Sequence, residues 1–309
     1  MKDWYEADST WEPWAKDREQ YAKAFVVEGR FHSGVHEDVV KDFRIATHIM
    51  ASAWYHYPMY DEALRKLLGT IEMAIKLRAK ELGIRVTKRT RLQELIDKLF
   101  PVDKGEQFNA QLHRLRDIRN RYAHPEHYSF GAIAIQPIMV PLVNTLNRVF
   151  LSDDQTAANQ TYLKTMRDRV AELAASAFVL TWQGHHYVIK EAVLLDAHQI
   201  NDKWVSLWAI YPVLDDAAEA LTVDNCPTPI MVGLEDAAII QGILVAMEQG
   251  TEKLVYLVPL SDSSYLNKVE EHIKAWESID TMEKEMMDMV QRQVVWSKLN
   301  EFQYQHFWV

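Results

Sequence analysis

Arginine and histidine gather in one short stretch of this chain, residues 114–128, with the sequence RLRDIRNRYAHPEHY. The stretch closes a segment with helical periodicity. On a helix, Arg116, Asn120 and His124 are four residues apart and share nearly one face, and Arg119 lies to one side of it. A proline follows His124 and disfavours helix there, so we expect the imidazole at the helix end, beside carbonyl groups that favour its protonated form. A histidine surrounded by cations suits phosphate chemistry.

These residue types match what RNA cleavage needs when no metal takes part. The reaction requires a base for the ribose 2′-hydroxyl, an acid for the leaving 5′-oxygen and positive charge at the phosphate. We assign Arg119 as the phosphate clamp, His124 as the proton carrier and Asn120 as a neutral donor that orients the histidine or the substrate. One copy supplies one proton-transfer residue. Two copies facing each other across a twofold axis would supply two, so a homodimer is part of this mechanism.

Further cations are candidates for holding the RNA backbone. Arg116 and Arg121 flank the catalytic candidates, and Lys88, Arg89 and Arg91 end a basic run that starts at residue 76. Phosphate contacts of this kind are sensitive to salt. The alternative is that these side chains form solvated helix faces and pair with acidic neighbours at helical spacing.

The pattern of Arg119, Asn120 and His124 resembles the signature of the HEPN domain. That signature is an arginine, a polar residue (Asn, Asp or His) directly after it, and a histidine separated from the arginine by four to six positions. The resemblance covers about residues 36–151. It implies a helical bundle, commonly dimeric, with a metal-independent endoribonuclease site at the dimer interface. It also implies a setting in toxin–antitoxin, abortive-infection or CRISPR-associated systems, with an antitoxin or another regulatory protein as a further partner.

Two other interpretations stay open. The bundle could be a non-catalytic binding or dimerisation module, with a C-terminal domain that recognises a protein or a small ligand. An enzyme centred in the C-terminal half would need convergent polar groups, which the sequence does not show. His185, His186 and His198 have no carboxylate or cysteine at a recognisable ligand spacing, so we expect neither a metal nor another cofactor. Cys226 has no recognisable partner histidine and is more typical of a bystander than of a nucleophile.

Helices must position the arginine- and histidine-rich stretch. Apolar residues recur at three- and four-residue spacing in most of the first half of the chain. This pattern predicts helices over residues 37–56, 60–82, 92–100, 106–123 and 141–151. We interpret residues 1–35, which are aromatic and acidic without a clear period, as a loosely structured arm with one short helix around 16–27. Residues 36–151 are then a compact helical bundle.

The pattern changes after a polar segment at residues 152–159. A helix is expected near residues 161–178. Short stretches rich in β-branched and aromatic residues then predict strands at 187–195, 204–211, 228–232 and 253–258. Residues 234–248 look helical and suggest a strand–helix–strand unit. Helices at 263–276 and 280–302 complete the chain. The predicted fold class is α+β, mainly α, with residues 152–309 forming an α/β domain that has a small sheet and a sensing, regulatory or partner-binding role.

Charge and composition narrow the class of protein. Residues 61–125 hold 15 basic and 9 acidic side chains in a chain whose net charge is −10, so one region is basic on an acidic protein. The single cysteine cannot form an internal disulfide, and no stretch has the roughly 20 apolar residues that a membrane span needs. The N-terminus lacks the apolar core of a signal peptide. We therefore expect a cytoplasmic protein that binds RNA and no membrane.

Overall fold

The computed structural model describes residues 5–122, 131–173, 177–214, 221–222, 227–261 and 263–308, with only the backbone at 103–105 and 263–264. The chain divides into two compact units. The first holds residues 1–151 with the last two residues, and the second holds residues 152–307. Each unit is described by itself.

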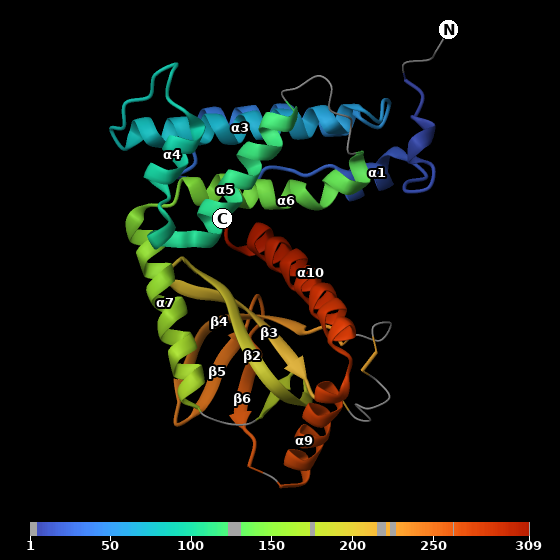
Figure 1. Ribbon diagram of the computed structural model, residues 1–309, viewed down its shortest axis with the longest axis vertical. Coiled ribbons are helices and arrows are strands. Elements are labelled where there is room, and N and C mark those ends of the chain that lie inside the picture. The colour runs from blue at the N-terminus through green and yellow to red at the C-terminus, as the bar shows by residue number, and fades with distance from the viewer. Residues whose placement is uncertain are drawn as a thin grey trace. The chain divides into compact units, whose positions relative to one another are not determined.

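The first unit is helical throughout its described part (Figure 1). Its helices are η1 (Ser9–Trp11), α1 (Arg18–Phe25), α2 (Glu37–Ser52), α3 (Met59–Glu81), α4 (Leu92–Leu99), α5 (Val102–Tyr122) and α6 (Ala132–Val149). Helix α3 is central, because α2, α4, α5 and α6 all pack against it. Its buried stripe includes Leu64, Leu67, Leu68, Ile71 and Ile75, the residues whose spacing predicts this helix. Helix α6 starts nine residues earlier than the predicted helix at 141 and contains two prolines.

The aromatic residues near the N-terminus belong to the core of this unit. Trp11 and Tyr21 are fully buried. The Trp11 indole donates to the Ala53 carbonyl at 2.8 Å, and the Tyr21 hydroxyl donates to the Met50 carbonyl at 2.5 Å. Trp11 and Tyr21 are therefore packed against the C-terminal end of α2, in contrast to the loose arm expected for this part of the sequence. At the other end of the chain, the Trp308 indole donates to Asn144 of α6 at 2.7 Å.

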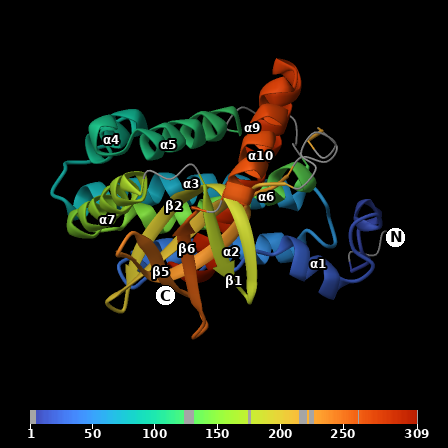
Figure 2. The same cartoon turned by 90° about the horizontal axis from the view of Figure 1, so that it is seen from below.

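The second unit is built on a closed antiparallel β-barrel. Its strands are β1 (Phe178–Trp182), β2 (His185–Ile200), β3 (Lys203–Pro212), β4 (Ile230–Ile240), β5 (Ile243–Glu248) and β6 (Leu254–Pro259). Each strand pairs with the next along the chain, and β6 returns to β1 to close the barrel, with Leu180 opposite Leu257. The strands are yellow to orange in Figure 1, and Figure 2 shows them after a turn of 90°.

The closed barrel shows that the predicted fold class, a mainly helical α+β chain whose C-terminal half is an α/β domain with a small sheet, is wrong. The predicted helix at 234–248 is the hairpin of β4 and β5, and β1 lies where the sequence predicts no strand. Tight turns build this meander. Gln183–Gly184, Asn201–Asp202 and Gln241–Gly242 each join two strands with both residues at positive φ, as type I′ hairpin turns require. Such turns leave no room for a helix between strands.

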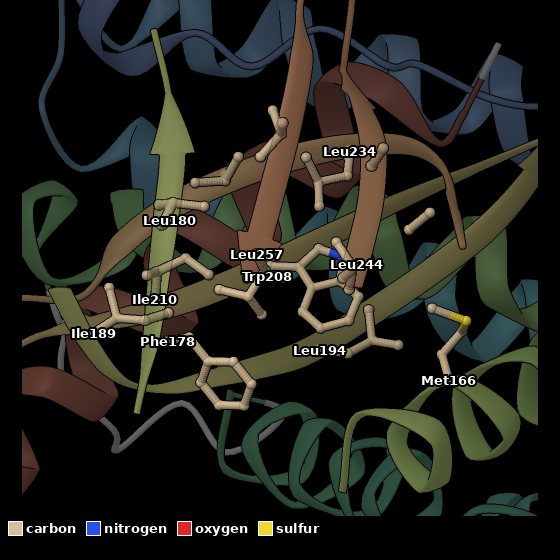
Figure 3. Close-up of a cluster of buried hydrophobic side chains, with 14 residues drawn as sticks. Met166, Phe178, Leu180, Ile189, Leu194, Trp208, Ile210, Leu234, Leu244 and Leu257 are labelled. Carbon is tan, nitrogen blue, oxygen red and sulfur yellow. The ribbon is translucent and has the colours of Figure 1, made fainter. Parts of the chain in front are cut away.

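Apolar side chains fill the inside of the barrel (Figure 3). Trp208 of β3 is 1% exposed and is among the largest of them. Around it lie Phe178, Leu180, Ile189, Leu194, Ile210, Leu234, Leu244 and Leu257, with Met166 contributed from outside the sheet. The barrel is thus a packed core, as small barrels with side-chain-filled interiors are.

In the described part of the second unit, three helices accompany the barrel. They are α7 (Asp153–Glu172), α9 (Ser263–Ser278) and α10 (Thr281–His306). Helix α7 packs against β2 and β4, and α10 packs against β3 and β4. The approach of α10 is close, since a Cβ placed on Gly233 of β4 would lie 2.5 Å from the ring of Phe302.

Candidate functional site

Helix α5 carries the arginine-rich segment in its last two turns. Leu112, Leu115 and Tyr122 are buried and fix the inward face of the helix. The opposite side leaves Asn120 exposed and the Arg119 side chain 41% exposed. Arg121 is exposed as well. His124, Pro125 and His127 lie outside the described residues.

Arg119 meets a carboxylate on the neighbouring helix. Its Nη2 atom lies 2.5 Å from Oε2 of Glu72 on α3, and its Nη1 atom donates to the Asn120 side-chain oxygen at 3.2 Å. The other oxygen of Glu72 lies 2.5 Å from Nζ of Lys76. One carboxylate therefore holds two cations. We call Glu72, Lys76, Arg119 and Asn120 the α3–α5 cluster.

The α3–α5 cluster has the charge and donors for a phosphate. Two cations against one carboxylate leave a net positive charge, and about two-fifths of both the Arg119 and the Lys76 side chains are exposed. The guanidinium is a planar fork that fits phosphate oxygens. Asn120 accepts from Arg119 through its oxygen, so its amide nitrogen can donate to a ligand. The sequence predicts a catalytic role for Arg119 and Asn120 and includes Lys76 only as the first residue of the basic run. Glu72, on the same helix as Lys76, is not predicted.

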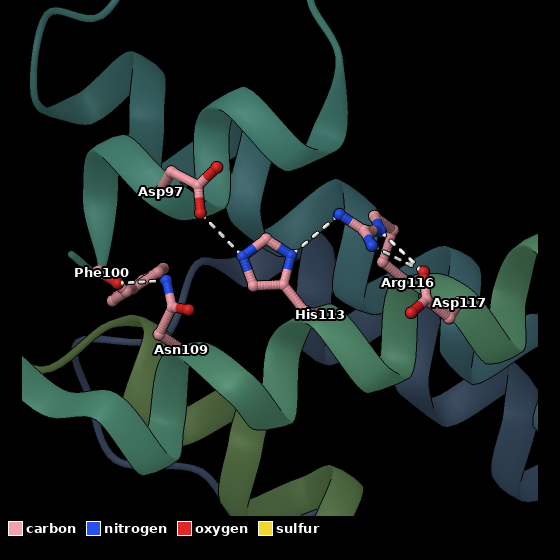
Figure 4. A network of polar contacts seen from close by, with 6 residues as sticks. All are labelled: Asp97, Phe100, Asn109, His113, Arg116 and Asp117. Atoms are coloured by element: carbon pink, nitrogen blue, oxygen red, sulfur yellow. Dashed lines mark hydrogen bonds and ion pairs between the residues drawn. The ribbon is translucent and has the colours of Figure 1, made fainter. Parts of the chain in front are cut away.

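Arg116 takes part in a different network (Figure 4). Its guanidinium donates to Asp117 at 3.0 and 2.7 Å and contacts Nδ1 of His113 at 2.9 Å. The other ring nitrogen of His113 lies 2.7 Å from Asp97 on α4. Arg116 thus helps to join α5 to α4 and is not part of the α3–α5 cluster.

The partners of His113 assign its tautomer. A guanidinium has only donors, so Nδ1 of His113 accepts from Arg116 and carries no hydrogen. The hydrogen is then on Nε2, which donates it to Asp97. This aspartate–histidine–arginine chain was not predicted from the sequence. A histidine three residues before Arg116 on one helix face was the available signal.

Tyr122 holds the end of α5 against α3. Its hydroxyl donates to the buried Asp61 at 3.3 Å, and the Arg65 guanidinium lies 5.6 Å from its ring centre. Burial, together with the negative charge of Asp61, raises the pKa of Tyr122. The last described turn of α5 is therefore anchored directly after the cluster residues Arg119 and Asn120.

The last three cations of the basic run lie in the connection from α3 to α4. Lys88, Arg89 and Arg91 are exposed, and Arg91 directly precedes α4. The connection is shaped by Thr87, whose backbone N–H donates to the Thr90 hydroxyl at 2.9 Å. In the part of the chain that the structure describes, none of these three cations bonds to α5, so they are not joined to the α3–α5 cluster.

The second unit contains a hollow and a buried histidine among its described residues. A hollow of about 350 Å³ lies beside α7 and β2, with Trp208 and Phe178 among its walls. The charged Arg167 at its edge already donates to the carbonyls of Leu194 and Leu195. His198, one of the isolated histidines of the sequence, contacts the Asn159 side chain at 2.8 Å.

Among the described residues, no three His, Cys, Asp or Glu side chains are grouped so that they could hold a metal ion. No described helix is both long enough and apolar enough to cross a membrane. No family model matches the chain, and neither the curated proteins nor the solved structures searched contain a match.

Proposed function

We propose that the end of α5 forms a metal-independent endoribonuclease site of HEPN type, completed by a second copy of the chain. The observation that carries the proposal is the α3–α5 cluster. It places a partly exposed guanidinium beside Asn120, four residues before His124 on the chain. These three residues are those of the HEPN-like pattern in the sequence.

In this proposal each side chain has one role. Arg119 binds the scissile phosphate and stabilises the charge that develops on it, while Asn120 donates to the substrate or to the histidine. His124 takes the proton from the ribose 2′-hydroxyl, and His124 of the partner subunit gives a proton to the leaving 5′-oxygen. The products are a 2′,3′-cyclic phosphate and a 5′-hydroxyl. Arg121, Arg116 and the basic run of Lys88, Arg89 and Arg91 contribute to RNA binding by charge.

The family resemblance supplies the biological part of the proposal. A ribonuclease of this type acts in a cytoplasmic prokaryotic defence or toxin–antitoxin system, where an antitoxin or another regulator controls it. The second unit, with its packed barrel, is then a candidate for sensing or partner contact.

A specific observation favours a second candidate function. The Arg119 guanidinium is already paired with Glu72 at 2.5 Å. An arginine committed to such a pair suits a non-catalytic module, in which α5 serves only for binding or dimerisation. The two candidates differ in whether bound RNA is cut.

Cleavage by two single variants separates the candidates. His124→Ala and Arg119→Ala should each lower the rate of RNA cleavage by about a hundredfold or more, the usual contribution of a proton-transfer residue and of a group that stabilises developing charge. Each variant should keep the oligomeric state of the parent. Arg114→Ala is the matched control, because Arg114 is an exposed arginine on the same helix. If either site variant cuts RNA as fast as the parent, the site is wrongly assigned. If the parent binds RNA without cutting it, the non-catalytic module is correct.

A further inference from the structure

Helix α10 carries an apolar stripe on its outer face. Met282, Met289 and Trp296 follow one another at seven-residue spacing, and they are 63%, 63% and 46% exposed. Seven residues turn a helix by almost two full turns, so the three side chains stay within about 40° of one another. The buried Met287 lies on the other side of the helix. Three large apolar side chains in line on one exposed face are typical of a contact surface.

Two opposite charges flank the stripe on the same side. Glu285 and Arg292 lie about 40° and 60° from Met289 around the helix axis, in the same direction, and both are exposed. Glu285 precedes Met289 by four residues and Arg292 follows it by three. The Arg292 side chain is 83% exposed, and its ion pair with Asp288 is long, at 3.8 Å. An exposed pair of this kind contributes little and leaves Arg292 available to a stronger partner.

We propose that this stripe binds the same stripe of a second copy of the chain, with the two α10 helices antiparallel and a twofold axis at Met289. Under that symmetry Met282 lies against the partner subunit's Trp296. Glu285 lies against the partner subunit's Arg292, and both contacts occur twice. A parallel pair would place these residues on one side of the contact in one chain and on the opposite side in its copy, so Glu285 and the partner subunit's Arg292 would not meet. The charges therefore select the antiparallel pair, as flanking charges do in paired helices.

A hollow beside the stripe fits this partner. It measures about 290 Å³ and lies between α10 and β3, with Trp296, Val295, Leu299 and Tyr211 in its walls. In the antiparallel pair the partner subunit's Met282 arrives at Trp296, next to this hollow. Methionine is flexible and fills irregular apolar gaps well. The contact is inferred from α10 and the barrel alone, so it does not depend on the proposed cleavage of RNA.

Cysteine cross-linking tests the geometry directly. In a Cys226→Ser background, Met289→Cys should form a disulfide between two chains under mild oxidation, because residue 289 meets its own copy at the axis. Met282→Cys is the matched control with equal exposure. Its two copies would lie about 21 Å apart along the helices, too far for a disulfide. Self-cross-linking at 282, or none at 289, would overturn the antiparallel pair.

Charge reversal and mass measurements test whether a second copy of the chain binds the stripe. The full chain should be at least a dimer by light scattering or sedimentation. Glu285→Arg and Arg292→Glu should each weaken association more than about tenfold, since each puts two like-charged pairs in contact. The double variant should restore the dimer affinity to within a few-fold of that of the parent. If both single variants keep the parent's dimer affinity, or if the double variant is no better than the singles, the contact between these stripes is refuted and another partner covers the face.

Discussion

The guanidinium of Arg119 lies 2.5 Å from a carboxylate oxygen of Glu72, and this contact ties the candidate catalytic helix α5 to the central helix α3. The Glu72 side chain is only 17% exposed, whereas that of Arg119 is 41% exposed. The carboxylate therefore holds the arginine from its inner side. A ligand would approach from the outer side.

Glu72→Gln should strengthen RNA binding. A phosphate competes with Glu72 for Arg119 and Lys76, and removing the carboxylate charge frees both cations. We expect binding to tighten by about three- to tenfold and its salt dependence to become steeper, because more cations contact phosphates. Fluorescence anisotropy of a labelled single-stranded RNA over a salt series measures both effects. Glu62→Gln is the control, since Glu62 pairs with Arg65 elsewhere on α3. Weaker or unchanged binding in Glu72→Gln would show that Arg119 does not hold RNA.

Tyr122→Phe should loosen the end of α5. The variant keeps the ring but loses the hydrogen bond to the buried Asp61. The free energy of unfolding should fall by about 1 kcal/mol, and more if the carboxylate is left poorly solvated. Urea denaturation measures the loss, and RNA cleavage should fall with it because Arg119 and Asn120 lie in the same turn. A variant as stable and as active as the parent would show that this anchor does not position the site.

Buried tyrosines should make the first unit unstable in alkali. Burial raises the pKa of Tyr21 and Tyr60 far above their ordinary value near 10. When pH rises above 10, the unfolded chain loses these protons while the folded chain keeps them, so the free energy of unfolding falls with pH. Each group contributes about 1 kcal/mol between pH 10 and 11, because the unfolded tyrosine is only partly ionised at pH 10. Tyr60→Phe should therefore flatten the decline between pH 10 and 11, as followed by urea denaturation. An equal slope in parent and variant would contradict the burial of this hydroxyl.

Gly233→Ala tests the packing of α10 on the barrel. The new Cβ would lie 2.5 Å from the Phe302 ring, so either β4 or α10 must shift. We expect a loss of about 1–3 kcal/mol in the free energy of unfolding, as overpacking usually causes. Combining Phe302→Leu with Gly233→Ala should recover part of the lost free energy of unfolding. If Gly233→Ala alone is as stable as the parent, α10 does not pack here.

The helices of the first unit follow directly from local sequence. The stripe from Leu64 to Ile75 repeats at helical spacing on α3, and burial of that stripe is what stabilises the helix. The barrel does not follow in the same way. Residues 234–248 are rich in Leu, Ala, Met and Glu, which favour helix, and the pairing with neighbouring strands overrides that preference. The Gln241–Gly242 pair between apolar residues was the local signal for a hairpin.

The candidate site was predictable only along one helix. Arg119 and Asn120 are adjacent in sequence, and the helical period shows that they share a surface with Arg116. The ion pair with Glu72 joins residues 47 positions apart, and no local pattern specifies such a contact. For the same reason the sequence predicts a role for Arg116 in RNA binding but not its contacts with His113 and Asp117 in the network that reaches α4.

The chemistry of RNA cleavage tests the central claim most directly. Purified protein is incubated in EDTA with a labelled single-stranded RNA, and with the same strand carrying 2′-deoxyribose at the position that is cut. The account predicts cleavage of the RNA to a 2′,3′-cyclic phosphate and a 5′-hydroxyl, and no cleavage at the deoxyribose. An RNA left intact, cleavage that EDTA abolishes, or cutting at the deoxyribose would contradict it.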